Sequence, residues 1–208
     1  HYSVPMTGGV VNTINTRLDT RTVAYILDHS DCKVFIVDRQ FHNVAIDAIA
    51  QVNREIIVID IDDKQAGLGD IPAIGQLEYE SFLQTGDEGF EWIRPDDEWQ
   101  AISLNYTSGT TGNPKGVVYH HRGSYLMSMG SITAWNMPNR LTYLYTVPMF
   151  HCNGWGYPWT LAMLHARVIF IRNIVVKEIF ELIAEHKLAH FGGAPIILNM
   201  LALSLIHI

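Results

Sequence analysis

The chain has 208 residues, a formal net charge of −7 and 48% hydrophobic residues, the composition of an ordinary globular protein with one sizeable core. The excess of acidic residues argues against a general binder of nucleic acids or of anionic membranes, because both partners require basic patches. No stretch is long and apolar enough to predict a transmembrane helix.

Helix-like and strand-like segments alternate through the first third of the chain. The apolar periodicity predicts helices over 22–29 and 41–52 and strands over 33–37 and 55–61. Asp19 or Thr20 is the expected cap of the first helix. This alternation is typical of βαβ units and predicts parallel pairing of the strands.

Residues 67–98 are rich in Gly, Pro and acidic side chains, with one short helix expected over 79–83. We interpret this segment as an irregular surface connection between a first lobe portion, 1–66, and a second lobe portion, 99–202. In the second portion we expect strands over 101–105, 116–119, 141–147, 167–171 and 189–191, and helices over 124–135, 155–164, 176–186 and 195–203. The predicted fold class is therefore α/β, with parallel-rich sheets and flanking helices.

The most informative stretch is 106–116, which reads YTSGTTGNPKG and follows a predicted strand. Its glycines allow successive backbone N–H groups to turn toward one anion, its hydroxyls add donors, and Lys115 adds a point charge suited to phosphate. The combination predicts a binding loop for a polyphosphate. A flexible, ligand-free hairpin is one alternative. The Walker P-loop is another, but it needs Gly before the lysine and Ser or Thr after it, whereas Pro114 and Gly116 flank Lys115.

The stretch resembles the signature of the adenylate-forming superfamily, which includes acyl-CoA synthetases, luciferases and the adenylation domains of peptide synthetases. The resemblance implies that the β- and γ-phosphates of ATP are bound by the motif residues Thr107, Ser108, Gly109, Thr110, Thr111, Gly112 and Lys115. It also implies Mg²⁺ as a cofactor, with the hydroxyl of Thr110, or that of Thr111, within its reach.

A second, aromatic-rich stretch, 148–159, follows a predicted strand and reads PMFHCNGWGYPW. Ligands of open α/β sheets bind at such carboxyl ends of strands, and His151 and Trp155 share one face if the turn between them is wound as a helix. Ordinary aromatic core packing is the alternative. The stretch resembles the next motif of the superfamily, which implies that His151 and Trp155 border the carboxylate and the acyl chain of the substrate. We therefore expect His151 and Trp155 to lie near the 107–115 loop at one edge of the sheet.

Other reactive side chains carry weaker predictions. Cys152 stands beside His151, but adjacent side chains usually point apart, which argues against a Cys–His nucleophile. The pair His120-His121 has no acidic or Cys neighbour, so exposed hairpin residues are expected there rather than a metal site. Cys32 and Cys152 form no CxxC pair, and a reducing, cytoplasmic compartment is the expectation.

Two further segments narrow the resemblance to short- and medium-chain acyl-CoA synthetases, including the subfamily that activates methylmercaptopropionate. They are NTINTRLD at 12–19 and HFGGAPIILNML at 190–201. Within the second segment, residues 192–195 form either a close-packed turn beside the acyl site or a plain strand-to-helix turn.

The resemblance covers essentially residues 8–201 and implies a partial N-terminal AMP-binding domain, 1–202. The superfamily's later Tyr-Gly-x-Thr-Glu motif does not occur, and no catalytic residue is assigned within the chain, so we expect it to be inactive alone. Residues 203–208 are expected to be a non-native tail, because their sequence LSLIHI is encoded by CTGTCTCTTATACACATC, which resembles a transposon end used in sequencing libraries. A natural Leu-rich helix is the alternative.

The reaction implied for the parent enzyme is activation of a short- or medium-chain carboxylic acid by ATP to an acyl adenylate, followed by transfer of the acyl group to coenzyme A. An amino-acid or aryl-acid adenylation domain and a non-catalytic nucleotide-binding module are the alternatives. The implied partners are the acid, ATP and coenzyme A, and a homodimer is left open.

Overall fold

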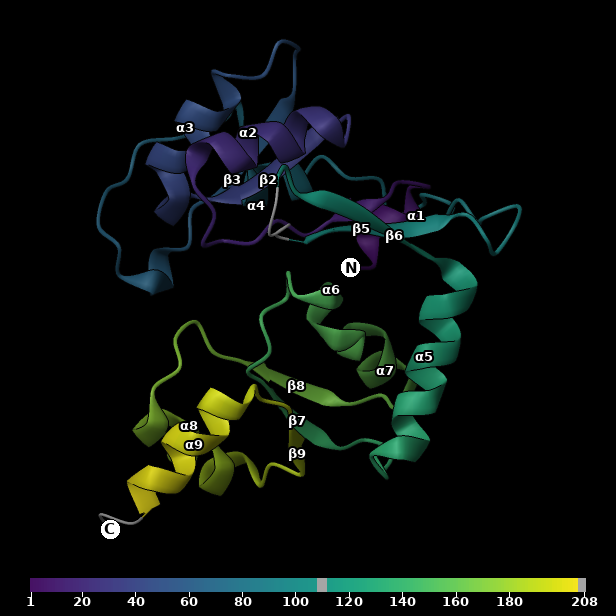
Figure 1. Cartoon of the computed structure of the whole chain (residues 1–208), viewed down its shortest axis with the longest axis vertical. Helices are drawn as coiled ribbons and strands as arrows, with labels where there is room; N and C mark the ends of the chain where they lie inside the picture. Colours follow the sequence, from purple (N-terminus) through teal and green to yellow (C-terminus); the bar gives the residue numbers. More distant parts are fainter. Residues whose placement is uncertain (108–111, 206–208) are drawn as a thin grey trace. The chain divides into compact units, whose positions relative to one another are not determined.

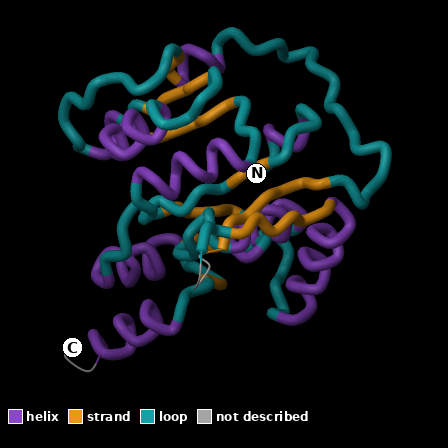
Figure 2. Tube along the Cα trace, turned by 45° about the horizontal axis from the view of Figure 1, so that its top comes forward, coloured by secondary structure: helices purple, strands orange, loops and turns teal. Residues whose placement is uncertain are grey.

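Short helices and strands alternate along the chain in the computed structural model, which describes residues 1–107 and 112–205 (Figure 1). Loops of varied length connect them (Figure 2). The elements are, in chain order, α1 (Ser3–Met6), β1 (Val11–Asn12), α2 (Thr20–His29), β2 (Val34–Asp38), the 3-10 helix η1 (Arg39–Phe41), α3 (His42–Ile49), β3 (Ile57–Ile61), the 3-10 helix η2 (Lys64–Ala66), β4 (Leu77–Glu78), α4 (Tyr79–Leu83), β5 (Ala101–Thr107), β6 (Lys115–His120), α5 (His121–Ala134), β7 (Thr142–Tyr145), α6 (Cys152–Trp155), α7 (Tyr157–Met163), β8 (Arg167–Phe170), α8 (Val176–His186), β9 (His190–Phe191) and α9 (Pro195–Leu205).

Each helix and strand predicted from the sequence has a counterpart in the structure, and α4 and α8 have the predicted bounds. Most other bounds differ from the prediction by one to three residues; the helix expected over 124–135, for example, runs from His121 to Ala134. Two of the differences bear on the packing and on the site. The helix expected over 41–52 ends at Ile49 and is preceded by η1, and the helix expected over 155–164 begins only at Tyr157. In the second case the chain first passes through a turn of the opposite hand, described below.

Parallel pairing dominates two of the three sheets found in the described residues. Strand β3 lies between β2 and β4 and pairs parallel with both. Strand β7 lies between β8 and β9 and is again parallel to both neighbours. The third sheet has the order β1-β5-β6. The predicted α/β class with parallel-rich sheets is therefore confirmed.

The chain forms two compact units, each made of segments that are distant in sequence. Unit 1 comprises residues 1–13, 95–103 and the chain from 118 onward, and unit 2 comprises 14–94 and the described part of 104–117. The change from one unit to the other falls within β5 and again within β6. The lobe portions 1–66 and 99–202 inferred from the sequence remain a prediction.

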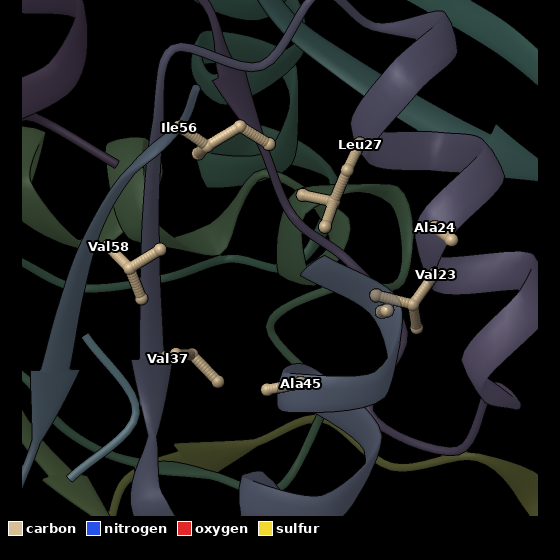
Figure 3. Close-up of a cluster of buried hydrophobic side chains, with 8 residues drawn as sticks. Val23, Ala24, Leu27, Val37, Ala45, Ile56 and Val58 are labelled. Atoms are coloured by element: carbon tan, nitrogen blue, oxygen red, sulfur yellow. The ribbon is translucent and has the colours of Figure 1, made fainter. Parts of the chain in front are cut away.

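The core of unit 2 forms where α2 and α3 pack on β2 and β3 (Figure 3). The Asp19 carboxylate accepts a hydrogen bond from the Thr22 N–H at 2.9 Å, so Asp19 is the cap and α2 begins at Thr20. Apolar residues then recur on one helical face and are buried. The buried cluster contains Val23, Ala24, Leu27, Val37, Ala45, Ala48, Ile56 and Val58. Burial of each large aliphatic side chain stabilises the fold by about 1.5–3 kcal/mol.

Strand β7 organises the cores of unit 1, because both of its faces are covered. Tyr143 and Tyr145 project to one face and pack with Tyr157 of α7. Leu144 projects to the opposite face and packs with Ile179 of α8. This double burial explains why the strand carries a continuous aromatic and aliphatic run rather than an alternating one. The chain that leaves the carboxyl end of β7 therefore starts from a rigid platform.

The segment 67–98 is mostly irregular and exposed, apart from β4 and α4. The Glu78 carboxylate caps α4 by accepting hydrogen bonds from the N–H groups of Glu80 and Ser81. No helix in residues 1–107 or 112–205 is long and apolar enough to cross a membrane.

Candidate active site

The predicted phosphate-binding segment joins β5 to β6. Strand β5 ends at Thr107 and β6 begins at Lys115, so the strands reach further into residues 106–116 than the sequence predicted. Residues 112–114 are not helical, and Lys115 opens a strand, as expected for a loop that is not a Walker P-loop. Four of the predicted site residues lie outside the described residues, and their ATP and Mg²⁺ contacts remain predictions: Ser108, Gly109, Thr110 and Thr111.

The described ends of this segment are held close to each other. The Thr107 hydroxyl donates to the Lys115 carbonyl at 3.5 Å, and both side chains are exposed. Gly112 has a φ of 136°, a conformation that side chains with a Cβ rarely adopt. An exposed lysine, an exposed hydroxyl and a glycine with this backbone conformation suit the binding of an anion.

Tyr106, which precedes Thr107, is anchored to α2 by a contact that sequence reasoning missed. Its hydroxyl lies 2.7 Å from Nδ1 of His29, and the His29 ring stacks on Tyr25 with ring centroids 5.1 Å apart. Burial, and to a lesser extent the Tyr25 phenol, raises the pKa of Tyr106 above its ordinary value. Tyr106 therefore stays protonated at neutral pH and fixes the end of β5 within unit 2.

The second predicted motif contains α6, which is not a regular α-helix but a left-handed turn that follows β7 in the chain. Cys152 and Asn153 have φ of 46°, Gly154 60°, Trp155 57° and Gly156 72°. The Trp155 N–H donates to the His151 carbonyl at 3.2 Å, which closes the turn. The expected winding between His151 and Trp155 is thus present but of the opposite hand. This hand costs about 1–2 kcal/mol for each residue that has a Cβ, so surrounding contacts must hold the turn.

Asn153 supplies part of that support. It is fully buried, its Oδ1 accepts a hydrogen bond from the Ser103 hydroxyl at 2.8 Å, and its Nδ2 lies 3.3 Å from the Thr13 hydroxyl oxygen. The Tyr145 hydroxyl donates to the Gly154 carbonyl at 2.9 Å. These contacts connect the turn to β5, to the chain after β1 and to β7, all within unit 1.

The two predicted substrate-binding side chains of the turn differ in solvent exposure. His151 is exposed, whereas Trp155 is half-buried with its ring centroid 6.4 Å from that of Tyr157. Cys152 is exposed and hydrogen-bonds Tyr119, whose pKa is raised by burial first and by Cys152 second. The turn therefore offers one imidazole and one indole edge near the carboxyl end of β7, where ligands of α/β proteins bind.

Residues 192–194 form a tightly packed turn between β9 and α9, which agrees with both sequence interpretations and does not separate them. A Cβ on Gly192 would lie 2.9 Å from the Tyr143 hydroxyl oxygen and 3.3 Å from a methyl of Val147. The Thr146 hydroxyl donates to the Gly192 carbonyl. Glycine is thus required where this turn meets the end of β7. Its place beside an acyl site remains a prediction.

The prediction of an exposed hairpin at His120-His121 is wrong. His120 caps α5, with its Nδ1 accepting a hydrogen bond from the Gly123 N–H at 2.9 Å, and its ring packs 4.6 Å from that of Trp99. His121 is the first residue of α5 and is partly buried, which lowers its pKa. In the described part of the chain no group of three or more His, Cys, Asp and Glu side chains is arranged to hold a metal ion.

The predicted site residues are divided between the units. His151 and Trp155 belong to unit 1, together with Asn153 and Gly192. Thr107, Gly112 and Lys115 belong to unit 2. The predicted proximity of the phosphate segment to His151 and Trp155 therefore remains a prediction.

Comparison with known proteins identifies close relatives of the whole chain. The family described as AMP-binding enzyme matches residues 1–207. The chain is 44% identical to a peroxisomal acetate/butyrate–CoA ligase of Arabidopsis thaliana, AAE7, and 41% identical to an acetate–CoA ligase of Humulus lupulus, CCL3. Each alignment covers 96% of this chain but only 37% of the relative, so the chain spans little more than a third of their length.

Solved structures share the fold of this chain. The N-terminal domain of FACL13 from Mycobacterium tuberculosis, solved with an inhibitor, matches 93% of this chain and 46% of its own length, with a TM-score of 0.74 at 27% identity. A protein from Rhodopseudomonas palustris, described as a putative long-chain-fatty-acid CoA ligase, matches 96% of this chain and 48% of its own length, with a TM-score of 0.79 at 15% identity, and shares the fold.

Proposed function

The chain belongs to the family of AMP-binding enzymes, and from this premise we propose that the protein of which it forms a part activates a carboxylic acid with ATP and transfers the acyl group to coenzyme A. The observation that carries the proposal is the identity of 44% and 41% to two named CoA ligases over nearly the entire chain. The exposed Thr107 and Lys115 at the ends of the Gly- and Thr-rich segment support it.

The reaction proceeds in two displacements. A carboxylate oxygen attacks the α-phosphorus of ATP, the bond to the β-phosphate oxygen breaks, and pyrophosphate leaves. The sulfur of coenzyme A then attacks the acyl carbonyl carbon, the bond to the phosphate oxygen breaks, and AMP leaves with the electron pair. In the first step Lys115 and the hydroxyls of the segment stabilise the charge that builds on pyrophosphate.

Mg²⁺ would accompany the phosphates of ATP. The ion prefers oxygen ligands and keeps most of its coordination from phosphates and water, so an exposed hydroxyl is a chemically suitable protein donor. Thr107 offers such a hydroxyl in the described part of the segment. We assign the closer contact to Thr110, or to Thr111, on the resemblance of the motif.

For the acid we propose a short or medium chain, bordered by His151 and Trp155. The relatives are named for acetate, butyrate and 2-methylpropanoate. The half-buried Trp155 packs toward Tyr157 and supplies apolar surface for a short alkyl group, while the exposed His151 supplies a donor for the carboxylate. Trp155→Ala should therefore alter acyl preference more than ATP affinity.

The compartment and the assembly state belong to the proposal as well. We propose a cytoplasmic enzyme. Because the Arabidopsis relative is named peroxisomal, imaging of the fluorescently labelled full-length protein must separate these two locations. A homodimer is tested by light scattering during gel filtration.

The test of the proposal is acid-dependent exchange of labelled pyrophosphate into ATP by the full-length protein. Exchange with acetate, butyrate or hexanoate, followed by thioester formation on addition of coenzyme A, is the expected result. Lys115→Ala should slow exchange by about 100-fold. Lys64→Ala, which removes another exposed lysine of unit 2, should leave it unchanged. Exchange only with amino acids or aryl acids, or none with any acid, would overturn the proposal.

A further inference from the structure

The turn at 152–156 is the most unusual backbone feature among the described residues. Five consecutive residues have positive φ, and three of them, Cys152, Asn153 and Trp155, carry a Cβ. L-residues rarely adopt this conformation in succession, and it persists only where the surroundings impose it. Such strain is most often kept where it places a functional group.

Asn153 is the residue through which the surroundings act. Asparagine tolerates the left-handed region better than other residues with a Cβ, and this one is fully buried. Its amide oxygen accepts from Ser103 at 2.8 Å, and its amide nitrogen lies 3.3 Å from the Thr13 hydroxyl oxygen. Ser103 is itself fully buried in β5. The amide oxygen therefore accepts a hydrogen bond from Ser103, and the amide nitrogen donates one to Thr13. Because only one orientation of the amide satisfies both partners, these bonds fix the orientation of the turn.

Neighbouring contacts hold the two sides of the same turn. The Thr13 hydroxyl also lies 3.5 Å from the Phe150 carbonyl, immediately before His151. The Tyr145 hydroxyl donates to the Gly154 carbonyl at 2.9 Å, immediately before Trp155. The backbone on which His151 and Trp155 are mounted is thus pinned on either side of Asn153.

We propose that Asn153 is a positioning residue for the acid-binding side chains. Its amide, held by Ser103 and Thr13, keeps the turn left-handed and so sets the directions in which His151 and Trp155 project. The inference rests on the proposed function for the identity of the ligand, a short carboxylic acid. The control of the turn by the amide rests on the geometry alone.

The geometry is tested by alkylation of Cys152 in the full-length protein. Cys152 is the exposed first residue of the turn, and peptide mapping separates it from Cys32. Asn153→Ala and Ser103→Ala should change the rate of Cys152 alkylation by iodoacetamide at least about fivefold. The controls are Asn136→Ala, which removes an exposed Asn of positive φ, and Ser128→Ala, which removes a fully buried hydroxyl bonded to its own helix. In both control variants Cys152 should be alkylated at the wild-type rate. Equal rates in the wild type, the two test variants and the two controls would overturn the proposal.

The positioning role is tested by acyl preference in pyrophosphate exchange. Misplacement of a binding group by about 1 Å can cost about 100-fold in rate. We expect Asn153→Gly, which permits the left-handed backbone but lacks the amide, to shift the ratio of kcat/KM for acetate and butyrate about tenfold, with KM for ATP changed less than about twofold. The same ratio as in the wild type, with rates reduced only in proportion to folded protein, would mean that Asn153 serves stability alone.

Two milder variants keep the test decisive if Asn153→Ala fails to fold. Ser103→Ala and Thr13→Val each remove one partner of the amide, and both should shift the acetate-to-butyrate ratio in the same direction as Asn153→Gly. Opposite or absent shifts would overturn the proposal. A wild-type protein without acid-dependent exchange would instead refute the proposed function and the assignment of the ligand, while the alkylation result would still decide whether the amide controls the turn.

Discussion

Gly154 offers the sharpest test of the left-handed turn. A Cβ at this position would lie 2.1 Å from the hydroxyl oxygen of Tyr145, 3.1 Å from its Cζ and 3.3 Å from its Cε1. Tyr145 is the last residue of β7 and is buried in the core, so its ring cannot swing away. Gly154→Ala therefore places a methyl group on a residue of positive φ and brings that methyl group into the Tyr145 side chain.

The expected cost follows from these two effects. A left-handed alanine costs about 1 kcal/mol or more, and overpacking of a well-packed core typically costs about 1–3 kcal/mol. We expect Gly154→Ala to lower the free energy of unfolding by about 3 kcal/mol. Tyr145→Phe removes the hydrogen bond to the Gly154 carbonyl and should cost about 1 kcal/mol. Because the same hydroxyl is the atom that the new methyl group strikes, the double variant should lose only about 2 kcal/mol, about 2 kcal/mol less than the sum.

The assay is urea unfolding of the full-length protein and of the three variants, compared at constant slope. Gly130→Ala is the matched control, because Gly130 lies on the exposed side of α5 and a Cβ there meets no atom within 4 Å. It should be neutral or stabilising, since alanine is the better helix former. The packing of a left-handed Gly154 against Tyr145 would be refuted by either of two results. One is a double variant whose loss equals the sum of the two single losses, and the other is a Gly154→Ala protein as stable as Gly130→Ala.

Three further predictions concern the acyl site and stability. In the full-length protein, Trp155→Ala should change the ratio of kcat/KM for acetate and hexanoate at least about tenfold at an unchanged KM for ATP, and an unchanged profile would defeat its assignment to the acyl site. Asp60→Asn should lower the free energy of unfolding by about 2 kcal/mol, because it removes the buried carboxylate that pairs with Arg39 and leaves this guanidinium with Asp62 alone. Asp31→Asn, which breaks the exposed pair with Lys33, should cost much less, and equal urea midpoints for the two variants would contradict this. Burial lowers the pKa of His121 below its ordinary 6.5, so the unfolded chain binds more protons below that pH and stability falls as the pH drops. His121→Asn should make the urea midpoint less sensitive to pH between about pH 7 and 5, and an equally steep fall in the variant would show that His121 is not responsible.

The elements that could be predicted are those whose local pattern and tertiary role agree. Helix α8 combines a regular apolar face with charged residues on the other side, and its predicted bounds are those observed. Strand β4 was missed because it has only two residues, and it exists through pairing with β3. No local preference of Leu77 and Glu78 encodes that pairing.

The candidate site likewise has one part that the local sequence predicts and one part that it does not. The Gly- and Thr-rich segment could be placed between two strands because its composition favours a loop and its neighbours favour strands. The left-handed turn could not be placed, although the dipeptide Asn153-Gly154 is typical of positive φ and was the one available indication. What sets the hand of the turn is a hydrogen bond between Ser103 and Asn153, fifty residues apart, and periodicity carries no information on such a contact.

The most direct test of the proposed activity follows one oxygen atom. The full-length protein is incubated with ATP, Mg²⁺, coenzyme A and acetate or butyrate labelled with ¹⁸O in the carboxylate, and the products are analysed by mass spectrometry. Attack of the carboxylate on the α-phosphorus predicts AMP that carries one ¹⁸O, unlabelled pyrophosphate and one thioester for each AMP. Label in orthophosphate together with ADP would show attack on the γ-phosphorus instead and would contradict the account, as would AMP released without label.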